Sequence, residues 1–203
     1  LLSLSARPGR SPLPPMSSPN AAAVLGLIDR MQSQKPYILA IDGRCASGKT
    51  TLANELSQSL SCNVVHMDDF YLPFALRTPE RMAQPGGNIE FERLKNEIIL
   101  PLKSGSDAVY RPYACHENRF LPSVTLSAAK STIVEGSYSC HPCLADMLGI
   151  KVFMDIAPDK QLSRIALRDQ GHVEAFRTMW IPREEFYFAE CAVRERCDMV
   201  LMN

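Results

Sequence analysis

The 203-residue sequence has no excess of charge, no long hydrophobic run and no dense set of cysteines. Lysine and arginine together number 22, as do aspartate and glutamate, so the formal net charge is zero. Proteins that bind nucleic-acid phosphates or anionic membranes need a basic surplus, so we expect neither kind of partner. Because no run of 18 uninterrupted apolar residues occurs, we also expect no membrane-spanning helix.

The cysteines are odd in number and widely spaced, at positions 45, 62, 115, 140, 143, 191 and 197. A secreted scaffold held together by disulfides is shorter and denser in cysteine, so reduced thiols and a cytoplasmic setting are expected. No basic segment precedes the apolar residues 1–4, and no long apolar core follows them. This pattern is not that of a signal peptide.

Apolar residues make up 46% of the chain and charged residues 22%, which is typical of a globular protein and excludes wholesale disorder. Residues 1–20 differ from the rest, because they contain five prolines and five serines. Such a stretch buries too little apolar area to offset its ordering entropy, so we predict that it is disordered, with Met16 as a plausible start. Residues 21–203 are predicted to form a single domain.

Short apolar runs alternate with amphipathic stretches. The runs predict buried strands at residues 37–41, 62–67, 131–134, 150–156 and 198–202. The stretches between them predict helices at residues 21–31, 49–60, 89–102, 160–167 and 183–196, with Asn88 capping the third and Pro158 opening the fourth. This alternation indicates an α/β fold, a parallel five-stranded sheet with helices on both faces.

A phosphate loop follows the first predicted strand and precedes a helix, which is the setting that this motif requires. The motif G-x-x-x-x-G-K-[ST] begins at Gly43 and ends at Thr50. Glycines let successive N–H groups turn towards a phosphate, and the positive end of the following helix adds to the attraction. We expect Lys49 to bridge the β- and γ-phosphates and the Thr50 hydroxyl to bind Mg²⁺. The candidate nucleotide-binding residues are Gly43, Arg44, Cys45, Ala46, Ser47, Gly48, Lys49, Thr50 and Thr51.

Acidic residues follow the next two predicted strands. Asp68 and Asp69 directly follow one strand, and Glu135 directly follows another. The carboxyl ends of neighbouring parallel strands open onto one crevice. A carboxylate there can accept the proton of an attacking hydroxyl or hold Mg²⁺, alone or through water. The predicted metal ligands are therefore Thr50, Glu135 and Asp68.

Two arginines lie four residues apart in the fourth predicted helix. Arg164 and Arg168 share one helix face, from which they could clamp the oxygens of a transferring phosphoryl group.

Three further features have plainer interpretations. The C-x-x-C pair Cys140 and Cys143 lacks the context of a redox or zinc site and is interpreted as incidental. His66 lies in an apolar strand and is interpreted as a packed core histidine. The aromatic stretch 180–188 is interpreted as core packing, with a wall of the acceptor pocket as the alternative.

Four short motifs together resemble the uridine kinase family of the phosphate-loop kinases, a group that includes phosphoribulokinase-like and pantothenate kinase-like enzymes. They read GRCASGKTT, MDDFY, VEG and LSRIALRD, and the similarity extends from about Tyr37 to Asp169. The resemblance implies a P-loop NTPase fold and transfer of the ATP γ-phosphate to a primary hydroxyl. It also implies that Asp68 is the catalytic base and that Glu135 joins the magnesium shell.

The acceptor region departs from the family pattern. The family's Asp-His-Pro stretch is replaced by the sequence QPGGN at 84–88, and its Tyr-Asp pair by Tyr113-Ala114, with His116 following. The candidate acceptor contacts are Tyr71, Asn88, Tyr113 and His116. The sequence thus predicts a kinase that uses ATP or another nucleoside triphosphate with Mg²⁺. Its acceptor is a small metabolite, with a nucleoside as the leading candidate. A pantothenate-like or sugar-phosphate acceptor, or a nucleotide-dependent switch without an acceptor, are the alternatives.

Overall fold

The computed structural model describes residues 18–31 and 36–203, so most of the segment 1–20 lies outside the described residues. Its last three residues, 18–20, cap and begin helix α1 (Pro19–Arg30). The Ser18 side chain accepts a hydrogen bond from the backbone N–H of Ala21, as N-cap side chains usually do.

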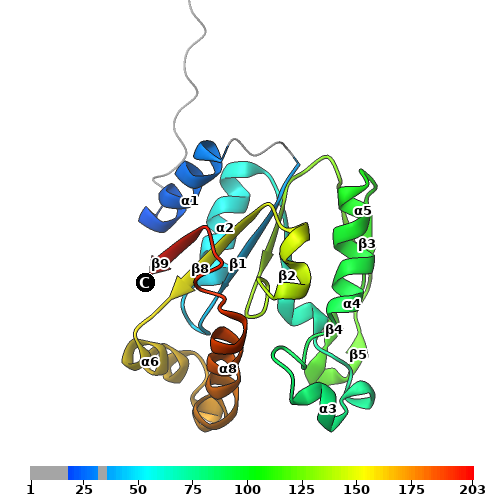
Figure 1. Cartoon of the computed structure of the whole chain (residues 1–203). Helices are drawn as coiled ribbons and strands as arrows, with labels where there is room; N and C mark the ends of the chain where they lie inside the picture. Colours follow the sequence, from blue (N-terminus) through cyan, green and yellow to red (C-terminus); the bar gives the residue numbers. More distant parts are fainter. Residues whose placement is uncertain (1–17, 32–35) are drawn as a thin grey trace, which may run out of the picture.

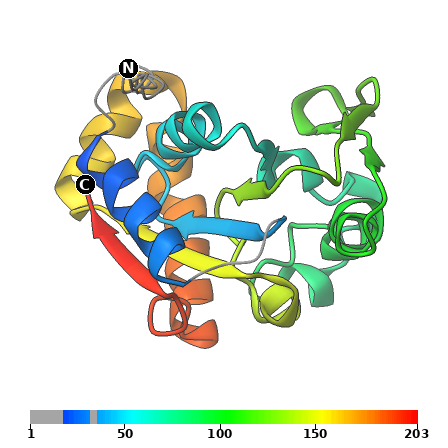
Figure 2. The ribbon, with the colours of Figure 1, turned by 90° about the horizontal axis from the view of Figure 1, so that it is seen from above.

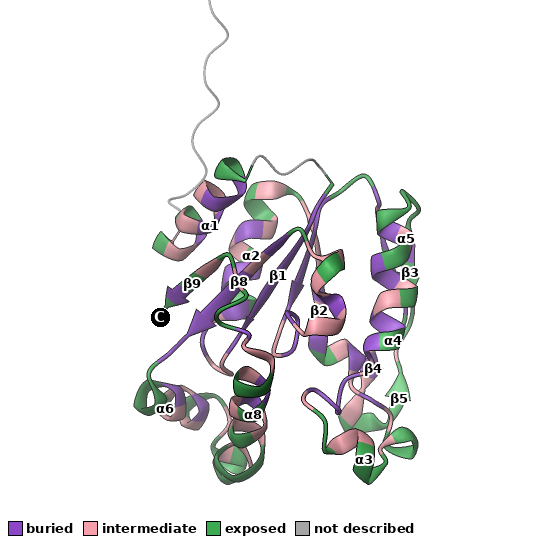
Figure 3. Cartoon of the chain, in the orientation of Figure 1, coloured by how far each residue is buried: buried purple, intermediate pink, exposed green. Residues whose placement is uncertain are grey.

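The centre of the molecule is a five-stranded parallel sheet (Figure 1). Its strand order is β2 (Asn63–His66), β7 (Thr132–Glu135), β1 (Ile38–Gly43), β8 (Ile150–Asp155) and β9 (Met199–Met202). All five predicted strands are confirmed, with ends that differ from the prediction by at most two residues. Figure 3 shows the central strands buried, whereas β2 and β9 at the two edges are partly exposed.

Two apolar layers cover the two faces of this sheet, because side chains along a strand alternate between its faces. Leu39 and Ile41 pack with α1 and α2 (Lys49–Leu60) on one face. Ile38 and Ala40 pack on the other face with residues of α4 (Phe91–Leu94), η5 (Pro142–Met147) and α8 (Ile181–Cys191). The predicted α/β architecture with helices on both faces is therefore confirmed.

The third predicted helix is one helical stretch with a wider turn inside it. It runs through α4, a π-helical turn η3 (Lys95–Ile99) and α5 (Leu100–Lys103). Pro101 has no N–H to donate to the carbonyl of Glu97, which explains a local departure from α-helical bonding. The prediction that Asn88 caps this helix is wrong, because the N-cap position belongs to Glu90.

Two other predicted helices differ mainly at their ends. Helix α6 (Pro158–Arg168) begins at Pro158, as predicted. Helix α8 ends at Cys191 instead of Arg196, because Ala192 has the left-handed conformation with φ of +46° and stops the helix.

Residues 67–128 also contain short elements that the sequence did not indicate. The strands are β3 (Ala108–Tyr110) paired with β6 (Val124–Leu126), and β4 (Tyr113–Ala114) paired with β5 (Arg119–Phe120). The short helical turns in this region are η1 (Met67–Phe70), η2 (Phe74–Leu76), α3 (Pro79–Met82) and η4 (Cys115–Glu117). Three further turns, η6 (Gln170–His172), α7 (Val173–Ala175) and η7 (Phe176–Trp180), lie between α6 and α8. Figures 1 and 2 show the segment from α3 to β6 on the side of the molecule opposite α1 and β9.

No helix within residues 18–31 and 36–203 combines the length and the apolar character needed to cross a bilayer.

Candidate active site

The phosphate loop (Gly43–Thr50) joins the end of β1 to the start of α2, as predicted. Gly43 has φ of +129°, and a Cβ there would lie 2.0 Å from the backbone oxygen of Met154 on β8. Gly48 is the N-cap of α2 and has φ of +98°. Both positions therefore require glycine, and the first N–H groups of α2 are left without intrahelical partners, as an anion site needs.

Lys49 lies beneath this loop with its side chain largely buried. Its Nζ donates hydrogen bonds of 2.7 Å to the backbone oxygens of Gly43 and Arg44. These contacts hold the ammonium group at the base of the loop, next to the amides of the α2 N-terminus. The positive charge is thus in place for a phosphate bound to those amides.

Thr50 and Glu135 meet at the ends of α2 and β7. The Thr50 hydroxyl donates to Glu135 Oε1 over 3.1 Å, and Glu135 is 5% exposed. The same carboxylate oxygen lies 2.6 Å from Nδ1 of His66. Parallel pairing of β2 with β7 puts His66 and Glu135 in register, which explains this contact between residues distant in the sequence.

The interpretation of His66 as a packed core histidine is wrong, because its side chain is 43% exposed and pairs with Glu135. β2 is an edge strand, so a side chain at its end is not enclosed. The hydrogen bond to Glu135 is the largest influence on the pKa of His66 and raises it against the opposing effect of burial. The nearby carboxylates of Asp69 and Asp68 act in the same direction.

This raised pKa predicts that the metal-free protein loses stability as pH rises. A group with a higher pKa in the folded state stabilises fully below its unfolded-state pKa, and that contribution disappears as pH passes the folded-state value. The free energy of unfolding of EDTA-treated protein can be measured with urea between about pH 5.5 and 8.5, a range that brackets the ordinary histidine pKa. We expect the stability advantage of wild type over His66→Gln to be largest at the acidic end.

His116→Gln is the matched control, since His116 is exposed and makes no ion pair with any described residue. A stability difference between wild type and His66→Gln that is independent of pH would contradict the assignment.

Asp68 and Asp69 are part of the 3₁₀ turn η1 that follows β2. The Asp68 carboxylate faces a cavity that Tyr71 also lines. Desolvation by the cavity walls raises the pKa of Asp68, Glu135 raises it further, and Lys49 lowers it. Asp69 turns away, because its Oδ2 accepts a 2.9 Å hydrogen bond from the Tyr110 hydroxyl.

The cavity has a volume of about 1170 Å³ and brings most of the predicted site residues together. Those that line it are Cys45, Ala46, Gly48, Lys49, Thr50, Thr51, Asp68, Tyr71, Asn88, His116, Glu135, Arg164 and Arg168. Gly43, Arg44 and Ser47 belong to the loop but do not line the cavity.

Tyr113 does not reach the cavity, in contrast to the prediction. It is buried in the β4–β5 hairpin, where its hydroxyl donates to Asn118 Oδ1 over 2.5 Å. Its neighbour Cys115 lines the cavity instead.

Asn88 supplies an unpaired polar group to the acceptor side of the cavity. It is 3% exposed, its backbone oxygen accepts from Leu72, and its side-chain Nδ2 has no partner among the described residues. A buried amide donor without a partner is costly, so a ligand that accepts from it is favoured. The rings of Tyr71 and Trp180 lie nearby, with centroids 6.3 Å apart. The aromatic stretch therefore contributes both a cavity wall, through Trp180, and core packing, through the fully buried Tyr187.

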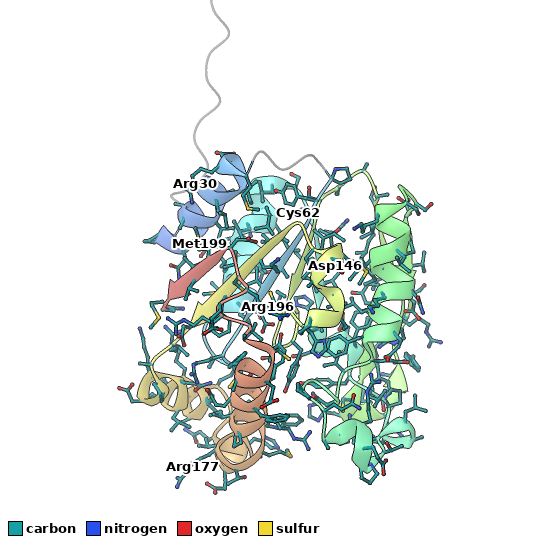
Figure 4. All side chains as sticks on the ribbon, in the orientation of Figure 1. Arg30, Cys62, Asp146, Arg177, Arg196 and Met199 are labelled. Atoms are coloured by element: carbon teal, nitrogen blue, oxygen red, sulfur yellow. The ribbon has the colours of Figure 1, made fainter. Side chains whose placement is uncertain are left out.

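The two predicted arginines have different surroundings. Arg164 donates to the backbone oxygen of Ala46 and to the side chain of Asn203. Arg168 is exposed, with its guanidinium 5.6 Å from the ring of Phe176. Between α6 and α8 lies the segment 169–180, which we name the α6–α8 connection. Figure 4 shows its Arg177 at the opposite end of the molecule from Cys62.

Sequence reasoning missed a group of buried residues that support the loop from behind. The buried Asp42 accepts hydrogen bonds from the backbone N–H groups of Tyr138 and Cys140 and from the Tyr187 hydroxyl. Tyr138 lines the cavity and has φ of +77°, an uncommon conformation for a bulky residue. Residues held in such a conformation by their surroundings cluster at functional sites. No motif identifies these residues, since Asp42 and Tyr138 are 96 positions apart.

The C-x-x-C cysteines form no bond with one another. The thiol nearest to Cys140 is that of Cys197, at 3.8 Å, and all seven cysteines are free. Both members of the pair lie outside the cavity lining.

The residues present fit a nucleotide with Mg²⁺. Within the described residues, no three His, Cys, Asp or Glu side chains form a complete metal cage. Mg²⁺ is normally held by one or two carboxylates together with phosphate oxygens and water. Beside the loop, Glu135 and Asp68 offer carboxylate oxygens and Thr50 offers a hydroxyl oxygen, all of which are suitable Mg²⁺ ligands.

No family model matches the chain. It is 28% identical over 146 residues to uridine-cytidine kinase B of Dictyostelium discoideum, covering 68% of this chain and 60% of that protein. It is 29% identical over 163 residues to a uridine kinase of Psychromonas ingrahamii, covering 73% and 75%. The chain thus spans less than two thirds of the Dictyostelium relative.

A solved structure described as a possible uridine kinase from Bacillus stearothermophilus matches with a TM-score of 0.68, covering 89% of this chain and 96% of that one at 21% identity. The fold is that of a P-loop kinase. The predicted resemblance to uridine kinases is also confirmed by the curated relatives. The phosphate loop, Glu135 and Asp68 are the centre of the candidate site.

Proposed function

We propose that this P-loop kinase transfers the γ-phosphate of ATP to a hydroxyl group of a small metabolite, with a nucleoside as the leading acceptor. The observation that carries the proposal is that Asp68 and the phosphate loop line the same cavity. A base and a phosphate site that share one cavity can bring an acceptor hydroxyl and a phosphoryl group together.

Each residue has a distinct part in this scheme. ATP supplies the phosphoryl group, and Mg²⁺ screens its charge. Lys49 and the amides at the start of α2 bind the phosphates. Thr50 and Glu135 hold the metal ion, and Asp68 orients the acceptor hydroxyl and accepts its proton. Arg164 and Arg168 are the candidates for neutralising the phosphoryl oxygens.

A screen of a metabolite panel tests the proposal. Purified protein is incubated with ATP and Mg²⁺ and with single nucleosides, pantothenate or sugar phosphates. ADP release and the mass of the phosphorylated product are then measured. We expect at least one nucleoside to accelerate ADP release and to yield a monophosphate. Slow ATP hydrolysis that no acceptor changes would instead identify a nucleotide-dependent switch.

The second candidate function is phosphorylation of another small alcohol. The buried, unpartnered Nδ2 of Asn88 favours it, because Asn88 lies where the uridine kinase pattern has its Asp-His-Pro stretch. The unpaired Nδ2 needs a hydrogen-bond acceptor, which a carbonyl, carboxylate or hydroxyl oxygen of the substrate can supply, whereas an ionised aspartate at such a position can only accept from hydroxyl groups. The same panel separates the two candidates.

A further inference from the structure

Glu184 of helix α8 places a buried carboxylate directly on the phosphate loop. The side chain is 4% exposed and lines the cavity. The backbone N–H of Cys45 points at both carboxylate oxygens, at 3.1 and 3.0 Å. The hydroxyl of Ser137, in the loop after β7, donates to Oε1 over 2.5 Å.

This carboxylate has no cationic partner, because no described lysine, arginine or histidine nitrogen lies within ion-pair distance. The adjacent Glu185 differs, since it pairs with Arg44. Burying an unpaired charge is costly, and here hydrogen bonds alone offset the cost. An anion beside a phosphate site also repels the ligand. The hydrogen bonds that Glu184 makes to the loop are therefore the contribution to examine.

Ala46, the loop residue that follows Cys45, shows how these contacts affect the loop. Ala46 has φ of +59°, a left-handed conformation that is unfavourable for a residue with a side chain and persists only where neighbours impose it. The peptide groups around it are all held by side chains. Glu184 accepts from the Cys45 N–H, Gln161 donates to the Cys45 oxygen over 3.2 Å, and Arg164 donates to the Ala46 oxygen over 3.1 Å.

Alternation of right- and left-handed residues is the geometry that turns successive N–H groups into an anion-binding nest. We infer that Glu184 is a positioning residue, which holds the Cys45 N–H so that the strained Ala46 turn is preformed before a nucleotide arrives. Because Gln161 comes from α6 and Glu184 from α8, both helices that flank the α6–α8 connection contact the phosphate loop. This inference deepens the proposed function and rests on it for the identity of the ligand.

The test compares Glu184→Ala with Glu184→Gln, which keeps an oxygen acceptor for Cys45 but removes the charge. We expect hydrogen exchange of the peptide that contains residues 44–47, measured without nucleotide, to speed up in the alanine variant and to stay near wild type in the glutamine variant. Binding of the ATP analogue AMP-PNP with Mg²⁺ should weaken about tenfold for alanine, the effect of losing a hydrogen bond to a charged group. For glutamine it should match wild type or be tighter, because the like charge is gone.

Glu190→Ala and Glu190→Gln are matched controls on the same helix, since Glu190 is exposed and away from the cavity. Thermal unfolding of every variant shows whether the fold is retained. Wild-type exchange and binding in the alanine variant would overturn the inference, as would glutamine and alanine variants that are equally impaired. If wild type binds no nucleotide, the proposed function fails, whereas the exchange measurement still decides whether Glu184 fixes the loop.

Discussion

Replacing Lys49 with alanine is expected to abolish phosphoryl transfer. The ammonium group lies at the base of the phosphate loop, 2.7 Å from the backbone oxygens of Gly43 and Arg44. Its effect is largest when negative charge shifts in the transition state, so the rate should fall by at least about 10²–10³-fold. Steady-state ADP release with the acceptor found by the panel measures the loss.

Two controls separate lost chemistry from lost structure. Lys49 is buried and donates to two carbonyl oxygens, so thermal unfolding must show that the alanine variant remains folded. Lys160→Ala, at an exposed position on α6, tests whether removal of any lysine lowers the rate. Turnover of Lys49→Ala within a few-fold of wild type would refute the assignment of the loop.

The parts of the fold that were predicted are those with a strong local signal. Strand β1, the phosphate loop and α2 are consecutive in sequence, and a buried apolar run, two glycines and a helical period specify them without long-range information. The five strands were found because buried parallel strands are continuous apolar runs. Their order, with β7 between β2 and β1, depends on contacts that no local pattern records.

The short hairpins were missed for the same reason. β3 to β6 have only two or three residues each, too few for a period of two to be detected. As a result, Tyr113 was assigned to the acceptor pocket although its hydroxyl bonds within its own hairpin. The turn η1 was likewise read as part of a strand.

Residues that support the phosphate loop from a distance could not be predicted. Glu184 contacts Cys45 across 139 positions, and Asn203 contacts Ser47 across 156. These contacts arise because parallel strands bring their carboxyl ends, and the segments that follow them, to one edge of the sheet. The sequence identifies such a residue only as a polar side chain in a helix or at a strand end. Packing decides its role.

Asp68→Asn is expected to bind ATP nearly normally and to transfer little phosphate. Side chains alternate between faces along a strand, but the two aspartates lie in the 3₁₀ turn η1, where successive side chains are about a third of a turn apart. They still diverge. Asp68 faces the cavity and Asp69 accepts from the Tyr110 hydroxyl.

Loss of a general base that acts in the transition state lowers the catalytic rate by about 10²–10⁴-fold, whereas ground-state binding of the nucleotide persists. Asparagine keeps the shape of the side chain but cannot take the proton. Calorimetry with ATP and Mg²⁺ measures binding, and formation of the phosphorylated product measures transfer. Asp69→Asn is the matched control and should be much milder, because an amide oxygen can still accept from Tyr110. Reversed phenotypes would move the role of base to Asp69. If neither variant loses transfer activity, the acceptor hydroxyl is activated by another group in the cavity, for which Glu135 is the next carboxylate to test.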